Sequence, residues 1–399
     1  MVFLFKTDPP GGTKDGVILR PDRCDRPRRH GRREWLRAMA TSGNEQGVTG
    51  PADSAGPADS PSVRFWSGDG TGARSARFVI ALMAPIALTG LVGAGTWIAY
   101  AVMTSVVAFA VDTGGRPMDR LLRMAIAGLL ILAGGFLGSL AAGHTALIAV
   151  MLAAMALLYG LLEYAEQSVA FAVRFLCIAT SVGALFAPLT PGGGGAIVLF
   201  VAIVWIVSVG WDALAGAWRP SSEPPLRVVL ERLEARRLQR WCFAVVVAAT
   251  VAIAFLVSVS IGLTRPNWAV FAIIVTMRMD VAVSRQTAVN LLLGTAVGSA
   301  AAAAYAALFP TPTGLLLGMT LAALLRWPAQ QLHNALGIAA MAAFIVLLID
   351  LASSMAGLAS HAPVDRLVDV SLGCAFALAG LLTNGALQWA LRRATARRL

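Results

Sequence analysis

Long apolar runs recur from residue 77 onwards, and they constrain the fold more than any other feature of this sequence. Hydrophobic residues make up 57% of the chain and charged residues 13%, a balance far from that of soluble domains. A helix that crosses a membrane needs about 20 apolar residues, and hydrocarbon offers no partner to unpaired backbone groups, so these runs are expected to be helices. About 12 spans fit this pattern, at residues 77–92, 96–111, 121–142, 145–162, 169–187, 196–211, 241–263, 268–283, 286–308, 314–326, 335–351 and 367–391. The predicted class is an all-α integral membrane protein.

One layout occurs twice in the sequence, more clearly the second time. In each copy an apolar segment opens on a tryptophan, a charged break follows, and the next apolar segment carries two glycines four residues apart. The corresponding residues are Trp97, 112–123, Gly134 and Gly138 in the first copy and Trp268, 278–285, Gly294 and Gly298 in the second. This duplication predicts two transmembrane halves of about six helices each that form a parallel pseudo-repeat, and duplicated membrane bundles are most often transporters.

Arginine is distributed unevenly among the loops, and this distribution sets the expected topology. The net charge is +11, and the positive-inside rule assigns arginine-rich loops to the cytoplasm. The arginine-rich segments are the N-terminal tail, 112–123, 219–240, 278–285, 326 and 392–398. Arg265 and Arg366 are exceptions, because they lie near loops expected outside. Both termini and the linker are then cytoplasmic, in a multi-pass protein of the bacterial inner membrane.

The segments outside the spans are polar. Residues 1–75 are too poor in apolar residues to fold alone and are expected to be a disordered basic cytoplasmic tail. Met39 is an alternative start, in which case residues 1–38 are a mistaken extension of the reading frame. The remaining boundaries are a first transmembrane half at 76–213, a cytoplasmic amphipathic linker at 214–240, a second half at 241–392 and a basic tail at 393–399.

No motif for enzyme chemistry is visible. No lysine follows Lys14, so the transmembrane region has no Walker A phosphate loop. The four cysteines have no metal-site spacing, and no nucleophile is paired with a base in a recognisable motif. Neither an enzymatic activity nor a cofactor or metal is expected. No nucleic-acid partner is expected either, because the arginines are concentrated in alternate loops and at the termini.

Residues 241–392 resemble the fusaric acid resistance-like (FUSC) or aromatic acid exporter family, and residues 76–213 do so only as a diffuse copy. The matching residues are Trp268, Arg285, Leu293, Gly294, Thr295, Gly298, the apolar span 334–350, Arg366, Asp369 and Gly373. Asn290 departs from the pattern, since the family often has a second arginine there. The resemblance implies export of weak organic, often aromatic, acids from the cytoplasm, driven by the proton gradient. The implied partners are the lipid bilayer, the acid and protons, with a homo-oligomer or envelope efflux partners as further candidates.

Charged groups inside spans are costly and therefore candidates for the anion pathway. Arg174 lies about one turn inside its expected span, where its guanidinium would contact a carboxylate; alternatively it reaches the interface and pairs with Glu163 or Glu166. Arg278 and Arg285 are placed to collect anions at the cytoplasmic end, unless they are ordinary positive-inside loop residues.

The carboxylates near span ends are candidates for proton coupling or gating. Asp280 would fix the geometry of its arginine neighbours. Asp350 ends a long apolar run, either as a proton carrier or as a solvated external residue. Arg366 and Asp369 are three residues apart on one helix face, and they form either a structural ion pair or a gate controlled by protonation.

The remaining candidates are aromatic and glycine residues. Trp97 and Trp268 occupy equivalent places and either flank an aromatic ligand or anchor their helices at the interface. The glycines expected at close helix contacts are Gly134, Gly138, Gly294, Gly298 and Gly373.

Two other functions stay open from the sequence. A passive anion channel is one, because plant malate channels share a related six-helix design. A non-transporting membrane scaffold or partner subunit, acting through the amphipathic linker, is the other.

Overall fold

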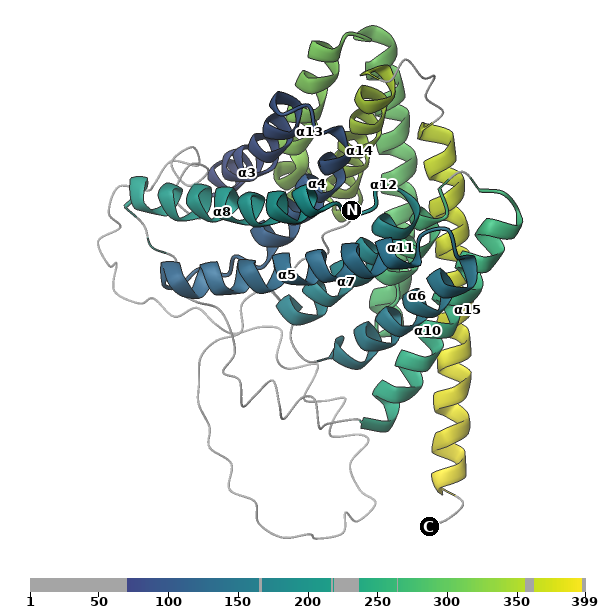
Figure 1. Cartoon of the computed structure of the whole chain (residues 1–399). Coiled ribbons are helices and arrows are strands. Elements are labelled where there is room, and N and C mark those ends of the chain that lie inside the picture. Colours follow the sequence, from purple (N-terminus) through teal and green to yellow (C-terminus); the bar gives the residue numbers. More distant parts are fainter. Residues whose placement is uncertain are drawn as a thin grey trace, which may run out of the picture. The chain divides into compact units, whose positions relative to one another are not determined.

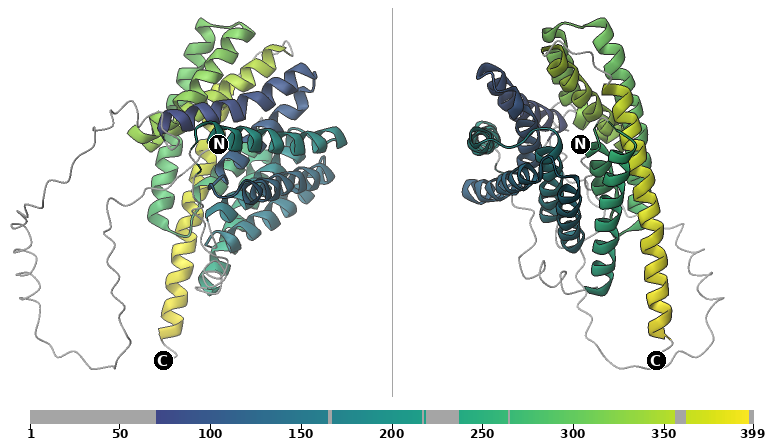
Figure 2. Two further views of the ribbon diagram at one scale, coloured as in Figure 1. Left: turned by 90° about the vertical axis from the view of Figure 1, so that its left-hand side faces the viewer. Right: turned by 45° about the vertical axis from the view of Figure 1, so that its right-hand side comes forward.

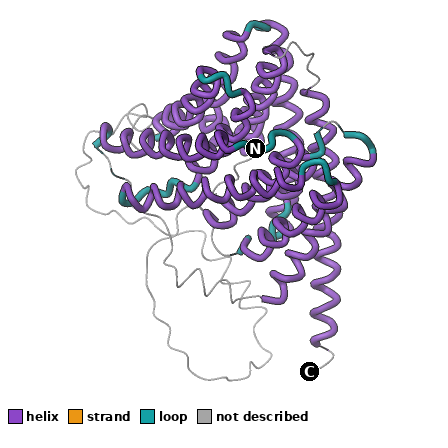
Figure 3. Tube along the Cα trace, viewed as in Figure 1, coloured by secondary structure: helices purple, strands orange, loops and turns teal. Residues whose placement is uncertain are grey.

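The computed structural model describes residues 70–164, 167–216, 218, 237–263, 265–355 and 362–396. Within these ranges the regular structure is helical and contains no strand (Figure 3), so the all-α prediction is confirmed. Most of the predicted N-terminal tail and linker lies outside the described residues.

The helices follow the order of the expected spans (Figure 1). Before the linker they are α3 (Thr71–Leu91), the 3-10 turn η1 (Gly95–Trp97), α4 (Ile98–Ala110), α5 (Pro117–Ala141), α6 (Thr145–Leu162), α7 (Gln167–Leu185) and α8 (Pro191–Leu214). After it they are α10 (Arg237–Ser260), α11 (Asn267–Thr276), α12 (Val281–Leu308), α13 (Pro312–Leu332), α14 (Asn334–Met355) and α15 (Ala362–Ala396). Among the described residues, 9 helices are long and apolar enough to cross a membrane, and α11 and α4 with η1 are shorter apolar helices. The chain is a multi-pass membrane protein, whereas two halves of six spans remain a prediction.

Two expected boundaries are wrong. The expected span 268–283 is interrupted, because α11 ends before the non-helical residues 277–280 and α12 starts after them. The Asp280 side chain caps α12 by accepting two backbone N–H groups, which is the usual role of an aspartate at this position. Arg326, expected in a loop, lies inside α13 and is only 1% exposed.

Glycines bring helices into close contact within each group. A Cβ atom on Gly138 of α5 would lie 2.2 Å from the Thr180 carbonyl oxygen of α7. On Gly298 of α12 it would lie 2.2 Å from the Ala339 carbonyl oxygen of α14. Gly134 and Gly294 make similar approaches in the same helix pairs, and Gly373 brings α15 against α11. Only glycine permits backbones to approach so closely.

The contacts between the two groups of helices are reciprocal. The fourth α-helix of the first group, α6, packs on the first α-helix of the second group, α10. Likewise the fourth α-helix of the second group, α13, packs on the first α-helix of the first group, α3. Gly160 of α6 lies against the backbone of Ala244 in α10. The last helix, α15 (yellow in Figure 2), runs beside α10 and α11. A buried apolar cluster joins α6, α7, α10, α11 and α15.

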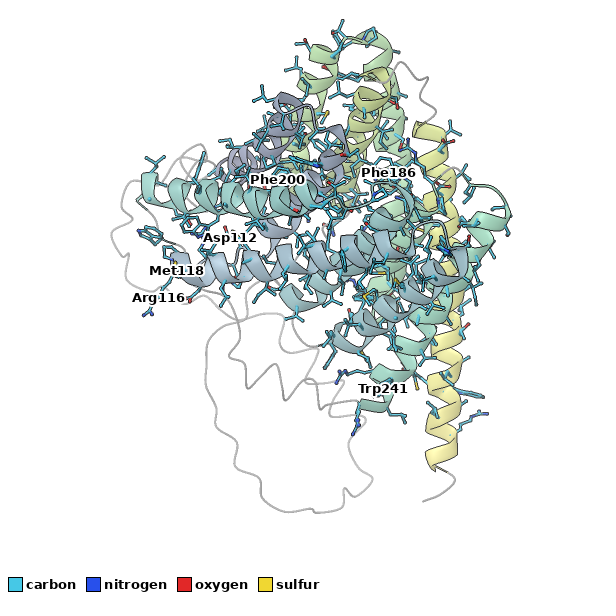
Figure 4. All side chains as sticks on the ribbon, in the orientation of Figure 1. Asp112, Arg116, Met118, Phe186, Phe200 and Trp241 are labelled. Carbon is cyan, nitrogen blue, oxygen red and sulfur yellow. The ribbon has the colours of Figure 1, made fainter. Side chains whose placement is uncertain are left out.

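A buried ion-pair network joins α3, α5, α8 and the segment after α4. Arg120 is fully buried, and its guanidinium binds both Asp112 oxygens at 2.7 and 2.8 Å and Asp212 Oδ2 at 2.7 Å. Arg77 Nη1 lies 3.1 Å from Asp212 Oδ1. Asp112 is labelled in Figure 4. The network was not predicted from the sequence, which indicated only a charged, arginine-rich cytoplasmic loop at residues 112–123.

Candidate functional site

A pocket of about 260 Å³ lies between α4, α7, α11 and α14. In chain order, α4 and α7 are the second and fifth α-helices of the group before the linker, and α11 and α14 are the second and fifth of the group after it. Its aromatic lining residues are Phe175, Phe186, Trp268 and Phe271, and its polar ones are Ser181, Arg265, Asn267 and Ser353. A mostly apolar cavity with a few polar groups is the usual form of a small-molecule site.

Trp268 lies in the pocket wall because α11 begins at Asn267, which places the indole in the first helical turn. Its ring meets Phe271 edge-on, with centroids 5.6 Å apart at an interplanar angle of 83°. The Arg366 guanidinium of α15 lies 4.2 Å from the Trp268 ring centroid, as in a cation–π contact. Side chains from α11 and α15 therefore hold Trp268, one of the residues predicted for the site. Trp97, its counterpart, packs on Gly192 and does not line the pocket.

Arg265 is the basic residue that lines the pocket. Its guanidinium carbon lies 5.8 Å from the ring centroid of Phe186, which Figure 4 labels at the end of α7. Arg265 was not among the residues predicted for the site. Its unusual position could have indicated a role, because Arg265 lies near a loop that is expected outside the cytoplasm.

Asp350 and Asp369 carry buried oxygen atoms without hydrogen-bond partners. Both carboxylate oxygens of Asp369 are in this state, and so is Oδ1 of the half-buried Asp350. The Arg366–Asp369 ion pair anticipated from the sequence is not formed, since the Arg366 guanidinium stacks on Trp268 instead. Asp350 does not end its helix as expected, because α14 continues to Met355.

A second group of charges lies where α6, α7 and the break between α11 and α12 meet. Arg174 Nη2 lies 3.7 Å from Glu163 Oε1, and Arg278 Nη1 lies 4.0 Å from the same atom. The Tyr159 ring faces Arg174, with the guanidinium carbon 5.0 Å from the ring centroid. We call Tyr159, Glu163, Arg174 and Arg278 the arginine cluster. Arg174 thus pairs with Glu163, while Glu166 lies outside the described residues.

The backbone of the break is held by side chains from two helices. The Tyr159 hydroxyl donates to the Met277 carbonyl oxygen at 2.6 Å, and the Arg278 N–H donates to Ser284 Oγ at 2.9 Å. Backbone groups without helical partners are tolerated at membrane depth only when protein groups satisfy them in this way. These hydrogen bonds therefore hold the break in a defined conformation, which places Arg278 beside Arg174.

The two other residues predicted near this break lie apart from the cluster. Asp280 is exposed and serves as the helix cap rather than as a partner of an arginine. Arg285 is exposed on the first turns of α12, not in a loop as the resemblance suggested.

Together these features define a multi-pass membrane protein with an aromatic pocket between its helices and buried basic groups nearby. Residues 248–380 match the family model described as fusaric acid resistance protein-like. The resemblance seen in the sequence is confirmed, and these residues form a fusaric acid resistance protein-like domain. No curated protein and no solved structure matches the chain. Trp268, Arg278, Arg366 and Asp369 lie inside the matched region, whereas Arg174 lies outside it.

Proposed function

We propose that this protein is a secondary transporter that exports small organic acids, preferentially aromatic ones, with coupling to protons. The observation that carries the proposal is the aromatic pocket, whose lining combines Trp268 and three phenylalanines with the single basic residue Arg265. Aromatic faces bind a planar ring, and a guanidinium binds a carboxylate.

The pocket size also favours a small substrate. Its volume of about 260 Å³ is slightly below the range of roughly 300–1,000 Å³ that is typical for drug-sized ligands. A single-ring acid such as 4-hydroxybenzoate belongs to the size class that this cavity would hold.

Proton coupling needs a carboxylate that changes its ionisation during transport, and Asp369 is our candidate. It is 1% exposed, and it lies one helical turn from Arg366, which contacts the pocket residue Trp268. Both of its carboxylate oxygens are buried without a hydrogen-bond partner, so no direct hydrogen bond stabilises its negative charge. Asp350 is the second candidate, and Asp280 is not one because its carboxylate is already used as a helix cap.

The test uses purified protein in liposomes with an imposed pH gradient and radiolabelled 4-hydroxybenzoate. Saturable flux that follows the gradient and is abolished by a protonophore is the expected result. Saturation without gradient dependence contradicts coupling, and a large electrical conductance would identify the passive anion channel instead. Absence of flux across a panel of aromatic and aliphatic acids contradicts transport and leaves the scaffold function.

The setting of this function is also proposed. We place both termini on the cytoplasmic side of the bacterial inner membrane, so that the acid leaves the cytoplasm. Association as a homo-oligomer or with envelope efflux partners is compatible with that direction.

A further inference from the structure

The charges of the arginine cluster do not balance. Its described members contribute two guanidinium groups and one carboxylate, and Glu163 is shared between Arg174 and Arg278. Arg174 is 6% exposed, so its charge is removed from water. Buried charges are normally paired, because isolated ones lose their hydration without compensation.

The hydrogen-bond donors of the cluster are also unsatisfied. Arg174 Nε and Nη2 and Arg278 Nε are buried without a hydrogen-bond partner. The contacts to Glu163, at 3.7 and 4.0 Å, are longer than the roughly 2.7–2.9 Å of a charge-assisted hydrogen bond. Glu163 therefore attracts both arginines without binding either one closely.

The ion-pair network around Arg120 shows what a completed arrangement looks like in this chain. Arg120 donates hydrogen bonds to both oxygens of Asp112 at 2.7 and 2.8 Å, and Asp212 pairs with both Arg120 and Arg77. Among the described residues, that network has two arginines and two aspartates. The described members of the arginine cluster include the same number of arginines but only one carboxylate.

The cluster lies level with one end of the aromatic pocket. Arg174 directly precedes the lining residue Phe175 on α7, a rise of about 1.5 Å along the helix. Phe171, one turn earlier, packs on Phe175 with ring centroids 4.9 Å apart. On the other side, α11 carries the lining residues Trp268 and Phe271 and ends just before Arg278. A substrate leaving this end of the pocket would meet the unsatisfied guanidinium groups.

We propose that the arginine cluster is a second carboxylate-binding site, at which the transported acid supplies the missing negative charge between Arg174 and Arg278. The ligand class rests on the proposed function, whereas the charge imbalance does not. A bidentate carboxylate would satisfy the donors that Glu163 leaves open. Binding would exclude the neutral amide of the same acid, which brings no charge.

Binding is measured by equilibrium dialysis of radiolabelled 4-hydroxybenzoate against the full-length protein in lipid nanodiscs. The wild-type protein is expected to bind two molecules, one in the pocket and one at the cluster. Arg174→Gln and Arg278→Gln should each weaken the second event by roughly tenfold or more, since each removes a charged hydrogen-bond donor. Arg285→Gln is the matched control, because Arg285 is exposed and outside the cluster.

Glu163→Gln supplies a test with the opposite sign. Removing the shared carboxylate raises the net positive charge of the cluster, so this variant should bind the acid more tightly than the wild-type protein. A folding defect would lower affinity, and it therefore cannot imitate this result. 4-Hydroxybenzamide should not compete for the second binding event, because it brings no charge to the cluster.

Several results would overturn the proposal. One is a binding isotherm that stays unchanged in the variants Arg174→Gln, Arg278→Gln and Glu163→Gln. Another is competition by chloride as strong as that by unlabelled 4-hydroxybenzoate, which would indicate a site for inorganic anions only. Flux in liposomes separates this failure from failure of the proposed function. Wild-type flux with unchanged variant binding rejects the cluster alone, whereas variant-sensitive binding without any flux rejects transport alone.

Discussion

Buried arginines in this protein have two distinct environments. Arg120 is fully enclosed and bound by two aspartates, which marks a structural ion pair. Arg366 and Arg174 are enclosed too, but they face aromatic rings and keep nitrogen atoms without hydrogen-bond partners. Because an unsatisfied buried charge destabilises the fold, its retention favours a role in binding or switching. The predictions at the scale of the residue concern this second environment.

Trp268→Ala should raise the KM for 4-hydroxybenzoate by about tenfold, since loss of an aromatic contact in the pocket costs on the order of 1.4 kcal/mol. Trp268→Phe should retain much of the affinity, because a ring remains beside Phe271. The measurement is initial flux against acid concentration in liposomes. Trp241→Ala is the control, since this indole is 46% exposed. It lies near the start of α10, where Figure 4 labels it. An unchanged KM in Trp268→Ala would remove the pocket from the pathway.

Asp369→Asn should uncouple transport from protons, because the amide can neither bind nor release one. With a gradient of one pH unit, exchange of one acid for one proton accumulates the acid up to about tenfold. The variant should reach a ratio near one while still exchanging labelled for unlabelled acid. The measurement is the steady-state ratio of labelled acid across the liposome membrane. Asp280→Asn is the control, because this exposed carboxylate caps α12, a role that asparagine also fills. Accumulation that persists in Asp369→Asn would place the coupling group elsewhere.

Trp268, Arg174 and Arg278 were predictable site residues, from the repeated layout and from the cost of charge in spans. Their arrangement was not predictable, because only the packing of α7 on α11 brings Arg174 and Arg278 together. Arg265 was passed over for a related reason. Its role depends on four helices that enclose a pocket, and no local pattern records that enclosure.

At the scale of the element, glycine positions decide how closely helices pack. Gly298→Ala should destabilise the protein, because a Cβ there would lie 2.2 Å from the Ala339 carbonyl oxygen and 2.8 Å from the Ala342 Cβ. Overpacking of this kind costs about 1–3 kcal/mol. Gly210→Ala is the matched control, since nothing lies within 4 Å of its Cβ position and alanine favours a helix. Thermal unfolding in detergent should show a lower midpoint for Gly298→Ala alone, and equal midpoints would contradict the observed contact.

The helices themselves were predictable and their breaks only in part. Apolar runs identify helices because lipid permits little else. The end of α11 was misplaced, because the expected span 268–283 was continued through the charged residues Arg278 and Asp280, whereas the Asp280 side chain already caps the next helix. Arg326 was assigned to a loop for its charge, although it lies in α13 near the rings of Phe78 and Trp327, with centroids 5.8 and 4.7 Å away.

At the scale of the whole molecule, the described helices on the two sides of the linker pack in corresponding ways. The third helix packs on the fifth in both groups, as α5 on α7 and α12 on α14, and the fourth of each group packs on the first of the other. The second helix is short in both, with 13 residues in α4 and 10 in α11. These correspondences favour two parallel halves of six spans each over a topology of nine spans.

The two topologies predict different positions for the loops. Helices of 13 and 10 residues are about 20 and 15 Å long, short of the roughly 30 Å hydrocarbon core. They can still cross if the non-helical residues next to them span the rest of the hydrocarbon core. Such residues need hydrogen-bond partners, and the Met277 carbonyl oxygen after α11 already accepts one from the Tyr159 hydroxyl. Likewise, aromatic rings shield Arg326 in α13. We therefore expect all twelve described α-helices to cross.

Single cysteines in a protein whose native cysteines are replaced by serine test this topology. With a cytoplasmic N-terminus and 12 crossings, His144→Cys and Pro310→Cys should react with an impermeant maleimide added to intact cells, and Arg116→Cys and His333→Cys only after permeabilisation. All four positions are exposed, so reactivity reports the side of the membrane rather than burial. If only the nine longer apolar helices cross, Arg116→Cys and His333→Cys react from outside and His144→Cys does not. That pattern would mean that the two halves have opposite orientations in the membrane. The correspondence between their helix contacts would then need a cause other than a parallel repeat.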